Sequence, residues 1–167
     1  MTKRLIAVSD SHGSVETLKA AFEQAMRHGS VDTAVFLGDG MRDFEQIKPM
    51  LAAARTDFFA VKGNNDWSAT EGSEAVFSFS GVRIFICHGH NQHVKYGLEQ
   101  LWFSARERDA QVALYGHTHQ ASLDYDQGIY LINPGAVYMR HKLRAAYAEL
   151  LVTDKGDITA RLVNWED

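Results

Sequence analysis

Residues 5–13 of this 167-residue chain read LIAVSDSHG, and this stretch carries most of the information on the fold. The unbroken apolar run Leu5–Val8 ends abruptly in polar residues, which is typical of a strand buried on both faces. A helical pattern of apolar residues then begins at Ser14 and ends at Gly29. A buried strand followed directly by a helix is the start of a β-α-β unit, and we therefore expect an α/β protein.

The same alternation continues to residue 66. Apolar runs at 33–37 and 58–61 predict two further strands, and a helical pattern over 43–54 separates them. Such short connections favour parallel strands with right-handed crossovers. The polar segments that follow the strands should then lie together at the carboxyl edge of the sheet, where open α/β sheets bind ligands.

The second half of the chain is richer in predicted strands. Two runs at 75–80 and 82–87 flank Gly81 as in a hairpin, and a helix is expected over 94–108. Five more strands are predicted at 112–115, 121–125, 129–132, 147–152 and 158–163. One sheet cannot easily hold so many strands, so two packed sheets flanked by helices are the simplest arrangement. The length of the chain fits one domain over residues 1–167.

Composition excludes several classes of protein. With 17 basic and 21 acidic residues the net charge is −4, which does not suit a general nucleic-acid binder. Cys87 is the single cysteine, so an intrachain disulfide and a Cys-based zinc site are excluded. We find no dinucleotide-binding, P-loop or serine-hydrolase motif. No apolar run is long enough for a membrane helix or a signal peptide, and we expect a cytoplasmic protein with no membrane partner.

Potential metal ligands follow the apolar runs directly, and most of them have a glycine as neighbour. Glycine lets the backbone turn sharply and approach a bound ion closely. If the predicted strands are neighbours, seven such side chains converge on one edge. They are Asp10, His12, Asp39, Asn64, His88, His117 and His119.

The types of these ligands narrow the choice of metal. Two carboxylates, one amide and four imidazoles are too many for one tetrahedral zinc, and they suit two ions about 3.5–4 Å apart with a bridging carboxylate. Mixed oxygen and nitrogen ligands favour Mn²⁺, our first choice, or Ni²⁺, Fe²⁺ or Zn²⁺, over Ca²⁺ and Mg²⁺. Such an ion pair activates water and neutralises phosphoryl oxygens during in-line attack, so phosphoester hydrolysis is the leading reaction class.

Five blocks of sequence, in this order, resemble the calcineurin-like metallophosphoesterases. They are Asp10-x-His12, Gly38-Asp39, Gly63-Asn64, His88-Gly89 and Gly116-His117-x-His119. The short chain, the segment 63–66 (GNND) and the later Asn133-Pro134-Gly135 resemble the small YfcE/MJ0936-type phosphodiesterase branch. The resemblance implies a four-layer αββα sandwich of two mainly mixed β-sheets flanked by helices, with a small phosphoester as substrate.

The resemblance also implies how the ligands divide between two ions. Asp39 would bridge the two metals. One ion would be held by Asp10, His12 and His119, and the other by Asn64, His88 and His117.

One position departs from the wider superfamily. Many members carry histidine directly after the Gly-Asn pair, where it contacts the phosphate or protonates the leaving group, but this chain has Asn65. An amide can donate a hydrogen bond but cannot act as a general acid. Diesters with acidic leaving groups are therefore favoured over monoesters. His90 or His93 could replace the missing histidine, and Asp66 is expected to support a neighbouring ligand.

Two other functions stay open. The chain could be a phosphomonoesterase, or a non-catalytic Vps29-like scaffold for protein interaction; the presence of all seven ligands favours an enzyme. Core packing is the default expectation for Trp67, Tyr96, Trp102 and Phe103, and the alternative is that they border the site or a homodimer interface.

Overall fold

The structure is a computed structural model that describes residues 1–166. Its first sheet has five strands in the order β10-β9-β1-β2-β3. The strands are β1 (Thr2–Val8), β2 (Thr33–Phe36), β3 (Asp57–Ala60), β9 (Ala145–Thr153) and β10 (Ile158–Asn164). Strands β1, β2 and β3 are parallel, as the β-α-β-α-β pattern predicted, whereas β9 runs antiparallel to both β1 and β10.

The second sheet also has five strands, in the order β4-β5-β6-β8-β7. The strands are β4 (Glu74–Phe79), β5 (Val82–Cys87), β6 (Val112–Leu114), β7 (Ser122–Asp126) and β8 (Ile129–Asn133). The three central strands are parallel, and the two edge strands pair with them antiparallel. Both sheets are therefore mixed.

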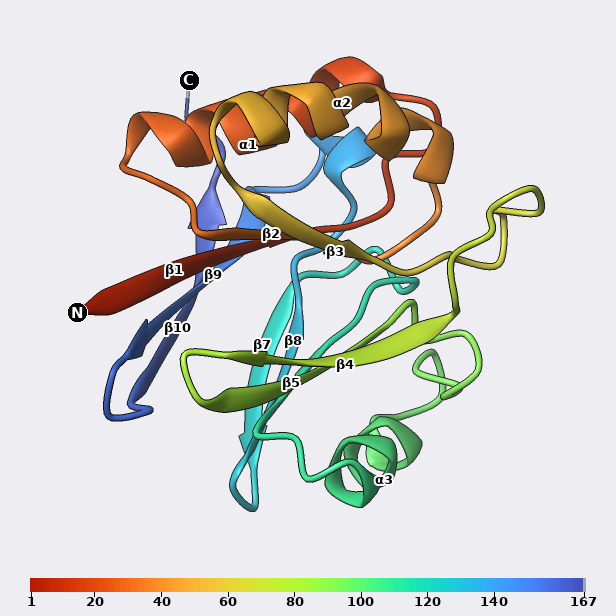
Figure 1. The fold of residues 1–167 in the computed structure, drawn as a ribbon. Helices are drawn as coiled ribbons and strands as arrows, with labels where there is room; N and C mark the ends of the chain where they lie inside the picture. Colours follow the sequence, from red (N-terminus) through yellow and green to blue (C-terminus); the bar gives the residue numbers. More distant parts are fainter. Residues whose placement is uncertain (167) are drawn as a thin grey trace.

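Helices cover the outer face of each sheet. Figure 1 shows α1 (Val15–Arg27) and α2 (Met41–Ala53) over the first sheet, and α3 (Glu99–Glu107) over the second. A short 3₁₀ helix, η1 (Val137–Met139), lies in the β8–β9 connection. The order helices, sheet, sheet, helix is the four-layer α/β sandwich that the family resemblance implied, and it agrees with the two packed sheets predicted from the strand pattern. Among residues 1–166, no helix has the length and apolar character needed to cross a membrane.

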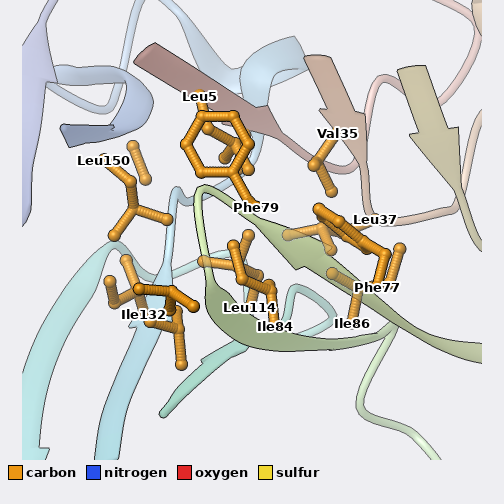
Figure 2. Packing of buried hydrophobic residues seen from close by; sticks show 14 of the residues in the cluster. Leu5, Val35, Leu37, Phe77, Phe79, Ile84, Ile86, Leu114, Ile132 and Leu150 are labelled. Carbon is orange, nitrogen blue, oxygen red and sulfur yellow. The ribbon is translucent and has the colours of Figure 1, made fainter. Parts of the chain in front are cut away.

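The alternation of side chains along β1 explains its unbroken apolar run. Leu5 and Ala7 point into the core between the sheets, while Ile6 and Val8 pack under α1 and α2. Figure 2 shows Leu5 in the inter-sheet core, with Phe79 of the second sheet beside it. Because both faces of β1 are buried, packing from two sides holds its carboxyl end in place. The residues that follow directly are therefore held in place as well.

Two sequence-based expectations need correction. The helix predicted over 94–108 begins only at Glu99, because residues 89–96 form successive turns and Gly97 has a φ of +149°. Trp102 is buried as expected, but Trp67, Tyr96 and Phe103 are 90%, 92% and 59% exposed. The prediction of core packing was wrong for these three residues, and a homodimer formed through them stays a prediction.

Candidate metal centre

Six of the seven predicted ligands meet where the carboxyl ends of the two sheets come together. They form two groups, and within each group one nitrogen or oxygen atom per residue lies within 4.8 Å of the others. The first group is Asp10, His12 and His119; the second is Asp39, His88 and His117. The segments that carry them follow β1, β2, β5 and β6, which belong to different sheets.

Short distances link the two groups into one site. In the first group, Oδ1 of Asp10 lies 3.1 Å from Nε2 of His119 and 3.4 Å from Nε2 of His12. In the second, Oδ2 of Asp39 lies 3.4 Å from Nε2 of His88. The same Asp39 oxygen is 3.6 Å from Nε2 of His12. Asp39 therefore faces both groups.

The backbone of these residues is strained. Positive φ angles occur at Asp10, His12, Asp39, His117 and His119, with values of 43° to 68°. Residues other than glycine rarely adopt positive φ angles, although Asp and His do so more often than most. Strained residues persist only where the surrounding structure fixes them, and they cluster at functional sites.

Asp66 fixes the turn that carries Asp39. Its two carboxylate oxygens accept hydrogen bonds from four main-chain N–H groups, those of Asp39, Gly40, Met41 and Gly63, at 2.7 to 3.0 Å. The sequence predicted that Asp66 supports a neighbouring ligand, and in the structure it accepts a hydrogen bond from the main chain of Asp39, a candidate ligand.

Two glycines allow the strand ends to approach each other. A Cβ atom on Gly116 would lie 2.0 Å from Oγ of Ser9, and one on Gly63 would lie 2.1 Å from Oδ1 of Asp39. No larger residue fits either position without displacing the Asp10 or Asp39 segment.

The two asparagines after Gly63 differ in the contacts that they make, and the role of Asn64 as a ligand stays a prediction. Asn64, the predicted amide ligand, is exposed, and the structure records no hydrogen bond from its side chain to residues 1–166. Asn65 instead faces Asp39: its main-chain N–H donates to Oδ1 at 2.9 Å and its amide donates to Oδ2 at 2.7 Å.

His90 is the one of the two candidate histidines that borders the site. Its ring centroid lies 5.5 Å from that of His88 and 6.1 Å from that of His117. Its Nδ1 is buried with no hydrogen-bond partner among residues 1–166, and burial and the charge of His88 lower its pKa. His93 is exposed and lies in a turn.

The family follows from a comparison of the whole sequence. A family model described as the calcineurin-like phosphoesterase superfamily domain matches residues 4–155. The chain belongs to this superfamily.

Two relatives are similar to this chain over most of their length. The probable metallophosphoesterase YsnB of Bacillus subtilis is 29% identical, over 94% of this chain and 88% of YsnB. The phosphodiesterase MJ0936 of Methanocaldococcus jannaschii is 24% identical, over 77% of this chain and 80% of MJ0936.

Solved structures share the fold. A predicted phosphoesterase of Streptococcus pneumoniae has a TM-score of 0.74 and 23% identity, with 99% of each chain covered. Vps29 of Entamoeba histolytica, solved in complex with Zn²⁺, has a TM-score of 0.71 and 18% identity, covering 96% of this chain and 98% of Vps29.

Buried atoms without partners test whether metal ions fit this candidate site. Oδ2 of Asp10 accepts hydrogen bonds from Ser9 and from the main chain of His117, but its Oδ1 has no hydrogen-bond partner among residues 1–166. Nδ1 of His88 donates to the Leu37 carbonyl at 2.6 Å, which leaves Nε2 as the free nitrogen, also without a partner. Both side chains are fully buried. Buried polar atoms normally have partners, and a divalent cation would satisfy both of these.

The protonation states of the site also suit cations. Burial alone would raise the pKa of Asp10, but the nearby imidazoles of His119 and His12 and the charge of His88 outweigh it and hold that pKa well below its usual range. Burial opposes ionisation of Asp39 as well, yet His88 and Asn65 lower its pKa to about 2. Burial and the neighbouring His88 lower the pKa of His117 to about 4. Two carboxylates and a neutral His117 are the forms that bind a metal ion. Asp10 raises the pKa of His12, and Asp39 raises that of His88 against the effect of burial, so these two imidazoles would release a proton when an ion binds.

Tyr138 touches the first group and was missed in the sequence. Its hydroxyl lies 3.4 Å from Nδ1 of His119, and its ring centroid lies 4.9 Å from that of His12. It follows the Asn133-Pro134-Gly135 turn, in which the Asn133 amide donates to the Gly116 carbonyl at 2.9 Å. The Asn133-Pro134-Gly135 motif was the one feature of the sequence that could have indicated that the β8–β9 connection returns to the site.

Proposed function

We propose that this chain is a metal-dependent phosphodiesterase. Two divalent transition-metal ions, with Mn²⁺ as first choice and Ni²⁺, Fe²⁺ or Zn²⁺ as alternatives, would be held by the two ligand groups, and Asp39 would bridge them. When bound, such ions lower the pKa of water and neutralise the oxygens of a phosphoryl group under in-line attack. The observation that carries the proposal is the pair of clusters around Asp39, with buried and unpartnered atoms of Asp10 and His88.

The protein side chains would hold and orient the substrate. Asn65 lies against the bridging carboxylate and can turn its amide N–H toward a phosphoryl oxygen. His90, beside His88 and His117, would contact the same phosphate from the other ligand group. Asn64 would complete the ligand set of the second ion by rotating its exposed amide inward.

A diester is the favoured substrate. The position after Gly63-Asn64 offers an amide rather than an imidazole, so the leaving group receives little help from a proton donor there. Diesters with acidic alcohols need less of that help. The kinship to a protein named as a phosphodiesterase points in the same direction.

Metal reconstitution tests the proposal. The protein, stripped with EDTA and reloaded with each ion in turn, is assayed on bis(p-nitrophenyl) phosphate and on p-nitrophenyl phosphate. We expect turnover that depends on the metal, is strongest with Mn²⁺, and is faster for the diester. Turnover of the monoester alone would establish a phosphomonoesterase, and no turnover with any metal would favour a binding protein such as a Vps29-like scaffold.

Asp39 carries the most specific residue test. Asp39→Ala removes the ligand that both ions share and should abolish turnover while the circular dichroism spectrum is kept. Asp57→Ala is the matched control, because it removes an exposed carboxylate from β3. Full activity of Asp39→Ala would refute the bridging role.

A further inference from the structure

A cavity of about 580 Å³ opens beside the candidate metal centre. Its walls are the first residues of α2 and residues 65–71, part of the segment between β3 and β4 that projects at the right of Figure 1. His12, Asp39 and Asn65 line it as well, so the cavity and the centre share a boundary. A group held in this cavity could therefore be an ester group of the same molecule whose phosphate is held at the centre.

The carboxylates in the cavity wall are already engaged. Asp66 accepts the four main-chain hydrogen bonds described above, and Asp43 accepts from Oγ of Ser11 at 2.5 Å and from the main chain of Gly13 at 2.8 Å. Glu45 and Glu71 both pair with Lys48. Hydrogen bonds therefore hold Asp43 and Asp66 in place, and Lys48 offsets part of the charge of Glu45 and Glu71.

Arg42 is the cation left for a ligand. It is exposed, it makes no ion pair with residues 1–166, and its Nη2 reaches only Oγ of Ser68, at 3.4 Å. This contact crosses from α2 to the opposite wall. A guanidinium group in this position can draw an anionic diester into the cavity.

Trp67 forms the apolar part of the same wall. Its side chain is 90% exposed, so packing within residues 1–166 does not explain the indole. A flat, exposed indole at the edge of a cavity stacks well on planar aromatic groups, and stacking on a nucleic-acid base typically strengthens binding by about tenfold or more.

We propose that this cavity is the subsite for one ester group of the substrate, and that it takes a planar aromatic group, such as a nucleoside or an aryl group, stacked on Trp67. Arg42 contributes the attraction for the anionic diester. The inference rests on the proposed phosphodiesterase function and adds the class of ester to it.

Diesters that share the p-nitrophenolate leaving group isolate this subsite. We compare the p-nitrophenyl ester of thymidine 5′-phosphate, bis(p-nitrophenyl) phosphate and methyl p-nitrophenyl phosphate. For the wild-type chain, kcat/KM should be about tenfold higher for the aromatic esters than for the methyl ester. A preference for the thymidine ester alone would assign a nucleoside, and a preference for both aromatic esters would assign any flat ring.

Trp67→Ala should remove this preference, because it should lower kcat/KM for the aromatic esters by about tenfold more than for the methyl ester, while Trp67→Phe keeps most of the preference. Phe103→Ala is the matched control, since it removes another exposed aromatic ring outside the cavity. Arg42→Gln should raise KM several-fold for all three esters, with a smaller effect at high salt.

The outcomes separate the two proposals. If no diester is hydrolysed with any metal, the proposed function fails; quenching of Trp67 fluorescence by thymidine 5′-phosphate, absent in Trp67→Ala, would still support the subsite. If the methyl ester is hydrolysed but Trp67→Ala leaves the ratio between esters unchanged, the function stands and the aromatic subsite is overturned.

Discussion

Replacement of Gly63 by alanine should disable the candidate metal centre and leave the chain folded. A Cβ atom at position 63 would lie 2.1 Å from Oδ1 of Asp39 and 2.6 Å from its main-chain nitrogen. Real Cβ atoms essentially never approach closer than 3.0 Å, so the Asp39 carboxylate must move from 2.1 to at least 3.0 Å, a displacement of about 0.9 Å.

The size of the effect follows from that displacement. Gly63 is not among the glycines with positive φ, so alanine carries no conformational penalty of its own there. A catalytic group displaced by about 1 Å can lose about 10²-fold in rate. Loss of the support around a ligand typically weakens metal binding by about 10- to 100-fold. We expect losses of this size in both properties of Gly63→Ala.

Titration calorimetry with Mn²⁺ and kcat/KM for bis(p-nitrophenyl) phosphate measure the two losses, and urea unfolding reports stability. Gly81→Ala is the matched control: its Cβ would meet nothing within 4 Å, but its φ is +83°. It should lose about 1 kcal/mol of stability and keep metal binding and activity. If Gly63→Ala binds Mn²⁺ as tightly as the wild type and keeps its activity within about twofold, the account of a pre-positioned bridging carboxylate is refuted.

Two further predictions concern Tyr138 and Glu149. Tyr138→Phe removes the hydroxyl beside Nδ1 of His119 and should weaken Mn²⁺ binding by about tenfold in calorimetry, with urea stability unchanged; an unchanged dissociation constant would exclude Tyr138 as a positioning residue. Burial opposes ionisation of Glu149, but hydrogen bonds from Arg161 and Arg4 outweigh it and lower its pKa, so its contribution to stability is present above about pH 4.5 and is lost as the pH falls through the lowered value. Glu149→Gln should therefore cost about 2 kcal/mol in urea unfolding at pH 7, with the gap from the wild type closing in acid; a gap that stays constant with pH would contradict this.

Local sequence pattern predicted the strand ends well. Four candidate ligands come within three residues of the end of a buried apolar run: Asp10, Asp39, His88 and His117. A run that is apolar on both faces is typical of a strand inside a sheet that is covered on both sides. Because such strands are parallel, the side chains that follow them lie at the same edge of the sheet. This is why six of the seven expected ligands come together without any knowledge of the loops.

Loop geometry could not be predicted in the same way. Whether Asn64 or Asn65 faces Asp39 depends on the turn that Asp66 imposes, and Asp66 reaches main-chain groups 25 to 27 positions earlier in the sequence. The late start of α3 likewise depends on turns around His93, where φ is +51°. Contacts between segments distant in the sequence decide these features, and hydrophobic periodicity carries no information on them.

The strain at the strand ends connects the fold with the site. Left-handed backbone costs roughly 1–2 kcal/mol at a residue other than glycine, and Asp and His lower that cost only partly. Five of the six clustered residues adopt it, and in the same place two fully buried atoms, Oδ1 of Asp10 and Nε2 of His88, lack partners. A chain selected for stability alone would relax both features, since ordinary turns connect strands equally well. The supports from Asp66 and Asn133 act on the main chain and hold the strained turns without occupying the free ligand atoms. The interior of the sandwich therefore supplies the stability that holds these two atoms toward a common point, as the proposed binding of cations requires.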